Sequence, residues 1–215
     1  MSDPQITVYG TEYSGHAHRV VLFLRMLGIP FRFVPAPAEM RRSAEFLKLN
    51  PLGQIPVLQD GLILIPDSNA ILVYLAKRYA LGSPWLPEEA LAAARVQRWL
   101  SIAAGELAHG PGLARRIVQW GGPGDRQRAL EIGGQLLRFM DAHLADTPYL
   151  AAAHPTLADL ACYSYTAHAP EGGLSLQPYP AVRQWLLRIE ALPRFEPMPS
   201  CPLPPEIPQH ELQPG

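Results

Sequence analysis

The order of strand and helix patterns in the first eighty residues is the feature that most restricts the fold. Ile6–Tyr9 is a short β-type run. Val20–Leu27 is apolar with Arg19 and Arg25 on another face, and a glycine and a proline then end it, which indicates a helix. Phe31–Val34 has β character again. Strand, helix and strand within about thirty residues form a βαβ unit, so we expect two parallel strands.

A hairpin between two further helices follows this unit. A short helix is predicted over Ala44–Leu49. Ile55–Leu58 and Leu62–Ile65 flank Asp60-Gly61, which is a strong hairpin signal. An Asp-Ser pair then caps a helix over about Asn69–Tyr79. A parallel pair followed by an antiparallel hairpin, in the order β-α-β-α-β-β-α, is typical of a thioredoxin-like sheet.

The pattern changes after Leu81, where a break rich in glycine and proline leads to Glu88. Helical patterns then cover Glu88–His109, Arg126–Leu144 after a loop around Gly121–Gly124, Thr156–Tyr165 and Ala181–Leu192. We therefore expect an α/β plus all-α protein with a thioredoxin-like N-terminal domain, residues 1–81, and an all-helical C-terminal domain, residues 88–200. A proline-rich, irregular tail is expected over residues 201–215.

Composition argues against several classes of protein. Eighteen basic residues against nineteen acidic ones give a net charge of −1, which argues against a nucleic-acid or anionic-membrane partner. No apolar run reaches the roughly 18 residues that span a bilayer, and the first residues lack a signal-peptide pattern. Cys162, Cys201 and the histidines show no metal-ligand spacing, so we expect no metal. Two cysteines in a chain of this length are typical of a cytoplasmic protein.

Three stretches of the N-terminal domain are expected to meet at one end of the sheet. They are Thr11–His18, Asn50–Val57 and the helix start at Asp67-Ser68. Strand ends and helix N-termini converge there, which is where α/β sheets bind ligands. Helix N-termini supply unpaired N–H groups and positive dipole ends, so we expect a ligand with a carboxylate and a second group that gains from being negative.

The residues of these stretches resemble the signatures of the glutathione transferase family. Ser14–Val20, Asn50–Val57 and Asp67–Leu75 are similar to the family motifs in order and spacing, and the resemblance extends to Thr156-x-x-Asp159. It covers the whole N-terminal domain and reaches into the second. The resemblance implies a transferase that binds glutathione as co-substrate, acts on a hydrophobic electrophile and forms a homodimer.

Ser14 is the catalytic residue that the resemblance implies, with its hydroxyl donating to the glutathione sulfur and favouring the thiolate. A serine here is equally typical of a helix N-cap. Its position five residues after Tyr9 resembles the serine-type theta and zeta classes, so Tyr9 is expected to be a strand residue. His16 either faces the sulfur or lines the turn. No cysteine lies in this turn, which argues against a mixed disulfide with the protein.

The resemblance also assigns the other glutathione-binding residues. The Ile55–Pro56 bond is cis in the family, and the Ile55 backbone then pairs with the cysteinyl part of glutathione. Gln54 resembles the residue that contacts a glutathione carboxylate. Asp67 would accept from the γ-glutamyl ammonium and Ser68 would hold its carboxylate, while both also act as helix caps. The family commonly has glutamate where this chain has Asp67, so its contact is the one to check.

Thr156 and Asp159 are interpreted as structural, with the Asp159 carboxylate bonding the backbone near Thr156 at a buried helix start. Such a cap is worth typically ~1 kcal/mol. The second substrate is expected between the domains, in a region that also contains packing and surface residues. Side chains that fall in this region are Leu107, His109, Leu113, Arg115, Arg116 and Trp120.

Two alternatives to a transferase stay open. The same site in a glutathione-dependent disulfide reductase or peroxidase would let glutathione itself supply the sulfur. A non-catalytic transferase-like interaction module would keep only the fold. Intact Ser14, Pro56 and Ser68 argue against the second alternative, because a scaffold has no need of a ligand site.

Overall fold

The computed structural model describes residues 5–205. Its N-terminal part holds a four-stranded sheet in the order β2-β1-β3-β4. The strands are β1 (Ile6–Gly10), β2 (Phe31–Pro35), β3 (Val57–Asp60) and β4 (Ile63–Pro66). β1 is parallel to β2 and antiparallel to β3, and β3 is antiparallel to β4. The predicted βαβ unit and the thioredoxin-like sheet are confirmed.

The turn of the β3–β4 hairpin lies one residue later than predicted. Asp60 is still paired within the ladder, so the turn residues are Gly61 and Leu62. Gly61 has a φ of 58°, and a glycine at the first turn position suits a two-residue hairpin. Asp60 is buried, and its carboxylate accepts hydrogen bonds from the hydroxyls of Tyr74, at 2.7 Å, and Tyr79. These contacts hold Asp60 in the strand.

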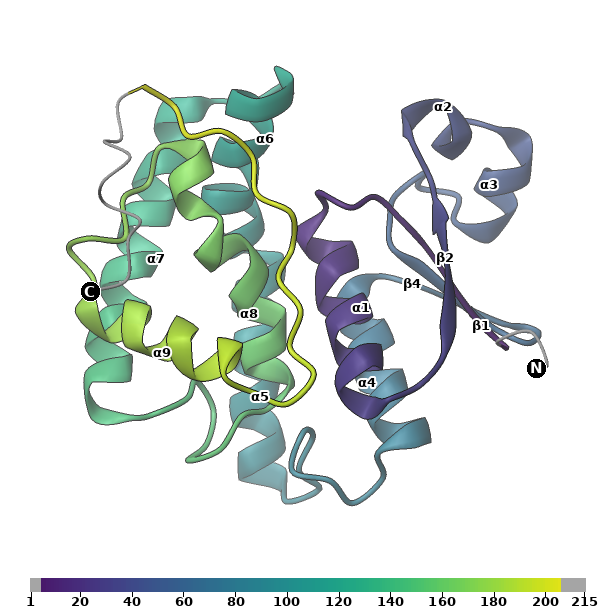
Figure 1. The fold of residues 1–215 in the computed structure, drawn as a ribbon, viewed down its shortest axis with the longest axis horizontal. Coiled ribbons are helices and arrows are strands. Elements are labelled where there is room, and N and C mark those ends of the chain that lie inside the picture. Colours follow the sequence, from purple (N-terminus) through teal and green to yellow (C-terminus); the bar gives the residue numbers. More distant parts are fainter. Residues whose placement is uncertain (1–4, 206–215) are drawn as a thin grey trace.

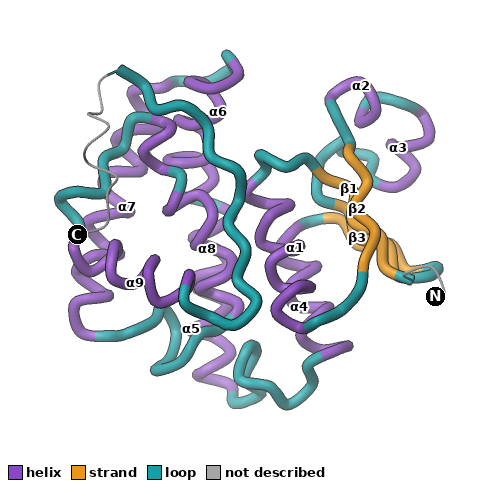
Figure 2. Tube along the Cα trace, in the orientation of Figure 1, coloured by secondary structure: helices purple, strands orange, loops and turns teal. Residues whose placement is uncertain are grey.

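Two helices lie between this sheet and the rest of the protein, α1 (Gly15–Leu27) and α4 (Ser68–Tyr79) (Figure 1). α1 begins five residues before the apolar period does, because Ser14 caps it there. Two short helices, α2 (Ala38–Arg41) and α3 (Ala44–Leu49), lie away from the helical part (Figure 2). α3 was predicted and α2, a single turn, was not. The sheet therefore presents α1 and α4 to the second half of the chain.

The C-terminal part is all helical, as predicted. Its elements are α5 (Ala90–Ala104), the π-helical turn η1 (Ala108–Gly112), α6 (Leu113–Trp120), α7 (Arg126–Asp146), α8 (Leu157–Ala167), the 3₁₀ turn η2 (Ala169–Gly172) and α9 (Pro180–Glu190). α6 occupies a segment for which no helix was predicted, because the Gly110-Pro111-Gly112 run interrupts the apolar period before it. α8 is the central helix, buried along almost its whole length.

A segment after α9, the C-terminal strap (residues 191–205), runs back along the boundary between α1 and α8 (Figure 1). His18 of α1 joins both sides of this boundary. Its Nδ1 lies 2.8 Å from the Ser164 hydroxyl of α8, and its Nε2 lies 2.9 Å from the Glu196 carbonyl of the strap. Burial lowers the pKa of His18 to about 4, so the ring is neutral at neutral pH. Arg25 adds an ion pair to Glu196 at 2.8 Å.

The connection between α4 and α5 coincides with the predicted break, and the division into domains at residues 81 and 88 stays a prediction. The predicted tail, residues 201–215, is irregular as far as residue 205, and its remainder lies outside the described residues. No helix within residues 5–205 is long and apolar enough to cross a membrane.

Candidate functional site

Ser14 stands at the start of α1, on the turn that leaves β1. Its Oγ accepts a hydrogen bond from the Ala17 N–H at 3.2 Å, and its own N–H donates to the Thr11 carbonyl at 3.1 Å. The next residue, Gly15, packs directly on α8, because a Cβ there would lie 2.8 Å from the Tyr165 ring. Ser14 is thus an N-cap whose hydroxyl proton is left to donate elsewhere, at a helix N-terminus that attracts negative charge.

His16 connects this helix start to the start of α4. Its Nδ1 lies 3.4 Å from the Ser68 hydroxyl, and its ring meets the edge of Tyr165 with 5.0 Å between ring centroids. Burial and the neighbouring Arg19 cation lower the pKa of His16 to about 3. His16 is therefore neutral at neutral pH and lines the turn beside Ser68.

The start of α4 is capped by Asp67, which has a φ of 74°. Its Oδ1 accepts from the N–H groups of Asn69 and Ala70, both at 2.9 Å. Asp67 is exposed, whereas Ser68 is buried. A positive φ outside glycine is uncommon and is held here by the two capping bonds. The predicted convergence of two helix N-termini is present, with Ser68 facing His16.

Arg19 lies beneath these helix starts and was not predicted as a site residue. It is fully buried, and its Nη1 donates to the Asn69 side chain at 3.0 Å and the Ser68 hydroxyl at 3.3 Å. Its Nε and Nη2 have no hydrogen-bond partner among residues 5–205. Burial lowers the pKa of Arg19, but a guanidinium keeps its proton in proteins. Within residues 5–205 this buried cation has no carboxylate at ion-pair distance, which makes the neighbouring site favourable for anions.

The loop before β3 forms the third side of the candidate site. The Ile55–Pro56 peptide bond is cis, as the resemblance implies. Buried Asn50 fixes the loop, since its amide donates to the Gln54 carbonyl at 2.9 Å and its Oδ1 accepts from the Leu52 N–H at 3.1 Å. The Gln54 side chain is exposed. The loop can therefore present both the Gln54 side chain and the Ile55 backbone to a ligand.

A cavity of about 400 Å³ adjoins this loop. Arg41 and Arg42 line it together with the Pro51–Gly53 turn, which precedes Gln54. Two guanidinium groups give this edge of the N-terminal part a positive charge that suits a carboxylate. The sequence contains no local signal that links these arginines to the site, because they approach it only through the α2–α3 connection.

Tyr9 lies in β1 and contacts β3 and α3. Its hydroxyl donates to the Gln59 side chain at 3.2 Å, and its ring meets the edge of Phe46 of α3. A hydroxyl already bonded to β3 is poorly placed to reach a ligand at the start of α1. This geometry agrees with the interpretation of Tyr9 as a strand residue.

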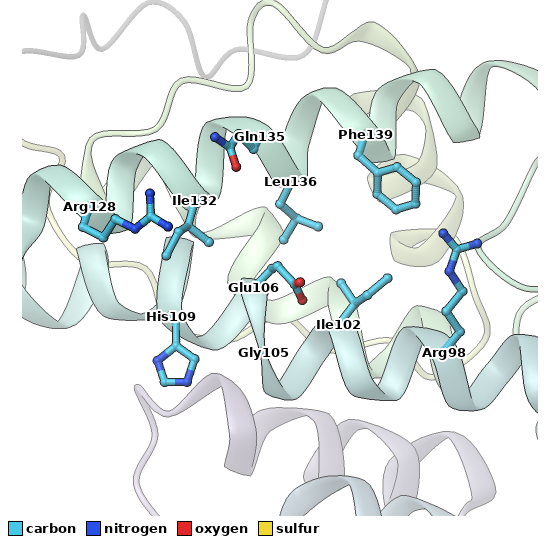
Figure 3. Close-up of a pocket in the computed structure, with 10 residues that line it drawn as sticks. All are labelled: Arg98, Ile102, Gly105, Glu106, His109, Arg128, Ile132, Gln135, Leu136 and Phe139. Atoms are coloured by element: carbon cyan, nitrogen blue, oxygen red, sulfur yellow. The ribbon is translucent and has the colours of Figure 1, made fainter.

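The residues considered for a second substrate have different environments. Leu107 is fully buried in the core. His109 lines a groove between α5 and α7 (Figure 3). Trp120 is half exposed, and its ring lies 6.0 Å from that of Tyr13, the residue before Ser14. Arg115 is buried and bonded to protein groups. Of these four, Trp120 is the side chain that combines exposure with a place beside the Ser14 turn.

The capping box at the start of α8 is present as predicted. The Thr156 N–H donates to Asp159 Oδ2 at 2.8 Å, and the Thr156 hydroxyl also donates to it at 3.1 Å. Asp159 Oδ1 accepts from the Leu150 N–H at 3.0 Å and the Trp185 indole at 2.9 Å. Burial raises the pKa of Asp159 and outweighs these donors, which act in the opposite direction. Asp159 thus joins the start of α8 to α9 and to the loop before it.

The described part of the chain contains side chains of the kinds that bind metals, and two thiols. Across residues 5–205, no cluster of three or more His, Cys, Asp or Glu side chains could hold a metal ion. Both cysteines are free thiols. Burial raises the pKa of Cys162 to about 12, which makes it unreactive, and Cys201 lies in the C-terminal strap.

Two family models match this chain in consecutive regions. Residues 13–78 match the model described as "Glutathione S-transferase, N-terminal domain". Residues 124–193 match the model described as "Glutathione S-transferase, C-terminal domain". The first match contains Ser14 and Ser68, and the second contains the Thr156–Asp159 capping box.

Individual relatives cover almost the whole chain. "Glutathione S-transferase 3" of Zea mays is 33% identical, over 93% of this chain and 96% of its own. A crystal structure of a glutathione S-transferase from Pseudomonas fluorescens superposes with a TM-score of 0.85 at 32% identity, covering 90% of this chain and 98% of that one. A theta-class structure from Xanthomonas axonopodis with glutathione bound has a TM-score of 0.79 at 26% identity, covering 89% and 95%.

Proposed function

The chain belongs to the glutathione S-transferase family and is a glutathione transferase, and we propose that Ser14 is the residue that activates glutathione in it. Glutathione is its co-substrate. The proposal concerns how this chain's own residues bind the tripeptide and favour its thiolate. The observation that carries it is the meeting of two helix N-termini, at Ser14 and Ser68, above the buried Arg19 cation.

Ser14 has the geometry of a hydrogen-bond donor to sulfur. Its oxygen accepts from the Ala17 N–H, which leaves the hydroxyl proton for an acceptor outside the helix. A donor and a helix N-terminus both stabilise a thiolate and lower the pKa of the thiol. His16, with a pKa of about 3, is too weak a base to hold the thiol proton at neutral pH, so this proton passes to water.

The remaining contacts of glutathione follow from the other two sides of the site. Ser68, through its hydroxyl and N–H, would hold the γ-glutamyl carboxylate, where Arg19 supports a negative charge. Asp67 uses Oδ1 for capping, so its other oxygen would accept from the γ-glutamyl ammonium. The backbone of Ile55, before Pro56, would pair with the cysteinyl part. Gln54 would contact the glycyl carboxylate at the positive edge of the loop.

The reaction proposed is attack of the bound thiolate on a hydrophobic electrophile. With an aryl halide, a sulfur–carbon bond forms and the halide leaves with its bonding electrons. With an enone, the sulfur–carbon bond forms at the β-carbon and water supplies the proton at the α-carbon. The exposed Tyr13 and Trp120 rings beside Ser14 provide an apolar surface for such a molecule. The protein contributes thiolate stabilisation and proximity.

Ser14→Ala is the direct test, with Ser43→Ala as a matched control. Both serines are N-caps whose oxygen accepts from an N–H three residues later at 3.2 Å, so both variants lose a comparable cap. Only Ser14→Ala should raise the pKa of the bound thiol. It should also lower the turnover of a chlorinated aromatic by about 100-fold, the typical cost of one lost hydrogen-bond donor. Equal thiol pKa in both variants would remove Ser14 from the mechanism. Turnover of a glutathione mixed disulfide in the same series separates a transferase from a disulfide reductase.

A homodimer is proposed on a separate observation. The β3–β4 hairpin exposes three apolar side chains in a row, Leu62, Ile63 and Leu64. A groove of about 740 Å³ between α5 and α7 offers apolar residues, including Ile102 and Phe139 (Figure 3). An apolar projection and an apolar groove on one chain allow a two-fold, self-complementary contact. Sedimentation should give a dimer for the wild type and a monomer for the Leu62→Glu, Leu64→Glu double variant, and a monomeric wild type would contradict the proposal.

A cytoplasmic, detoxifying role is proposed from the thiols and the site. Cys162 and Cys201 form no disulfide within residues 5–205, and a chain without disulfides is typical of a compartment kept reducing by glutathione. The same compartment supplies the co-substrate. A loss of tolerance to chlorinated aromatics on deletion of the gene would support the role, and unchanged tolerance would contradict it.

A further inference from the structure

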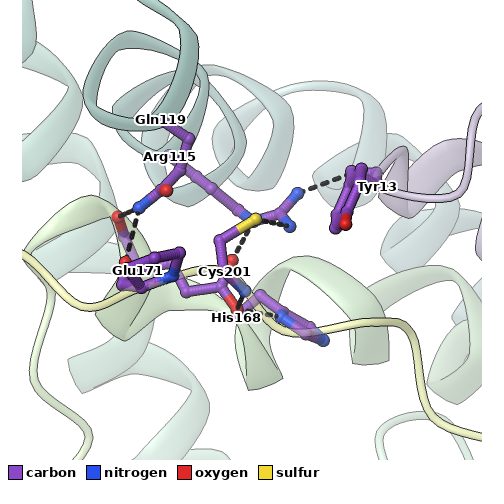
Figure 4. Close-up of polar contacts among 7 residues, drawn as sticks. Tyr13, Arg115, Gln119, His168, Glu171 and Cys201 are labelled. Atoms are coloured by element: carbon purple, nitrogen blue, oxygen red, sulfur yellow. Dashed lines mark hydrogen bonds and ion pairs between the residues drawn. The ribbon is translucent and has the colours of Figure 1, made fainter.

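Arg115 of α6 crosses from the helical part of the protein to the turn that carries Ser14. Its side chain is buried, with 1% of the residue's surface exposed. Its Nη1 donates to the Tyr13 carbonyl at 2.6 Å, although the two residues are 102 positions apart in the chain. Figure 4 shows the guanidinium reaching toward Tyr13 from the helical side. The group is therefore a contact between α6 and the β1–α1 turn.

The other side of the guanidinium is held by Glu171 of η2. Arg115 Nε donates to Glu171 Oε2 at 2.5 Å. Glu171 Oε1 accepts from the Cys201 N–H at 2.9 Å and lies 2.6 Å from His168 Nδ1 (Figure 4). Burial alone would raise the pKa of Glu171, but the bonds from His168, Cys201 and Arg115 outweigh it, and the pKa lies below its ordinary value. The carboxylate is thus ionised and bonded at both oxygens, and it orients Arg115.

The Tyr13–Ser14 peptide is consequently fixed at both of its polar atoms. Arg115 holds the Tyr13 carbonyl oxygen, and the Thr11 carbonyl accepts from the Ser14 N–H at 3.1 Å. A peptide unit is planar, so fixing its oxygen and its nitrogen fixes the orientation of the plane. The Ser14 Cα lies in that plane, and the direction of its side chain depends on it. Trp120 covers the guanidinium at 5.0 Å and so screens this contact from water.

We propose that Arg115 is a positioning residue for Ser14, through which the helical part of the protein sets the direction of the Ser14 hydroxyl. The inference rests on the proposed function of Ser14. Arg115 itself touches neither the thiol nor the electrophile in this mechanism. Its effect passes through the Tyr13 carbonyl. A displacement of the hydroxyl by about 1 Å weakens its hydrogen bond to sulfur and can lower the rate as much as 100-fold.

The test is Arg115→Lys, which keeps the buried positive charge but replaces the planar guanidinium, whose separate nitrogens bond Tyr13 and Glu171, with a single ammonium of different geometry. We expect the pKa of the bound thiol to rise, and kcat to fall about tenfold or more with a smaller change in KM for glutathione. Gln119→Leu is the structural control, because Gln119 donates to the Glu171 and Pro202 carbonyls and does not bond Tyr13. It should lower the melting temperature and leave the thiol pKa as in the wild type.

A double-mutant cycle with Ser14→Ala separates this inference from the proposed function. If Arg115 acts through Ser14, adding Arg115→Lys to Ser14→Ala should raise the thiol pKa no further. A wild-type thiol pKa and kcat in Arg115→Lys, with Ser14→Ala affected, would overturn the role of Arg115 alone. No effect of Ser14→Ala would overturn the proposed function instead. If Arg115→Lys does not fold, the neutral pair Arg115→Gln, Glu171→Gln replaces it, with the same expected rise in thiol pKa.

Discussion

Replacement of Asp159 by asparagine tests whether the buried carboxylate is the structural centre of the helical domain. The side chain is fully buried and accepts four hydrogen bonds. An amide of the same shape keeps one oxygen for Leu150 and Trp185, but it turns an NH₂ group toward the Thr156 N–H. A buried donor left without an acceptor costs about 1–3 kcal/mol, and loss of the cap adds about 1 kcal/mol.

The free energy of unfolding should therefore fall by about 2–4 kcal/mol, or roughly 10 °C in melting temperature for a chain of this size. Urea unfolding followed by tryptophan fluorescence measures it, because Trp185 donates to Asp159. Asp141→Asn is the control. Its Oδ1 accepts one bond from the described part of the chain, from the Val182 N–H at 3.0 Å, and an asparagine oxygen can keep that bond. A loss below about 1 kcal/mol in Asp159→Asn would refute the reasoning, since it would mean that Asp159 is protonated and already acts as a neutral group.

The remaining predictions concern pH, packing and backbone conformation. The pKa of His18 is about 4 in the folded protein and near 6.5 in the unfolded chain. On acidification the unfolded chain therefore binds a proton at a higher pH than the folded protein does. The free energy of unfolding should consequently fall by up to about 2 kcal/mol between pH 7 and 5. Urea unfolding at both pH values should show a smaller fall in His18→Gln, and an equal fall would contradict this assignment. A Cβ at Gly133 would overlap Leu174, so Gly133→Ala should lower the free energy of unfolding by about 1–3 kcal/mol. A Cβ at Gly134 would meet only the end of the Arg138 side chain, at 3.6 Å, so Gly134→Ala should raise it by about 0.5–1 kcal/mol. A higher melting temperature for Gly133→Ala than for Gly134→Ala would contradict the close packing of Gly133 against Leu174. Arg194 has a φ of 62°, a left-handed conformation that glycine adopts more readily than arginine. Arg194→Gly should therefore raise the free energy of unfolding by about 1 kcal/mol in the same assay. An unchanged or lower free energy of unfolding would contradict this prediction.

Capping and turn residues that are local in the sequence predicted most of the fold. The Thr156-x-x-Asp159 cap, the helix start at Asp67 and the β-hairpin depend on residues that are neighbours in the chain. The hairpin turn was displaced by one residue because Asp60 has partners in α4, outside the local signal. Local rules thus predict where elements begin, and tertiary contacts adjust them.

The two buried arginines show where sequence reasoning reaches its limit. Arg19 meets Ser68 and Asn69, which are about fifty positions away, and Arg115 meets Tyr13 and Glu171, which belong to different halves of the chain. Nothing in the residues around either arginine distinguishes it from a solvated one. A single sequence could therefore suggest which side chains would face glutathione, but not the groups that would orient them.

The C-terminal strap has a consequence for the biosynthesis of the enzyme. The N-terminal domain, which carries Ser14 and Ser68, leaves the ribosome first. His18 acquires its Glu196 partner, and Glu171 its Cys201 partner, only when the last part of the chain emerges. A nascent chain halted before residue 196 would contain every residue proposed to bind glutathione, yet the strap that runs along the boundary between α1 and α8 would be absent. Emergence of the strap is in this sense a late step in assembling the structure around the proposed site.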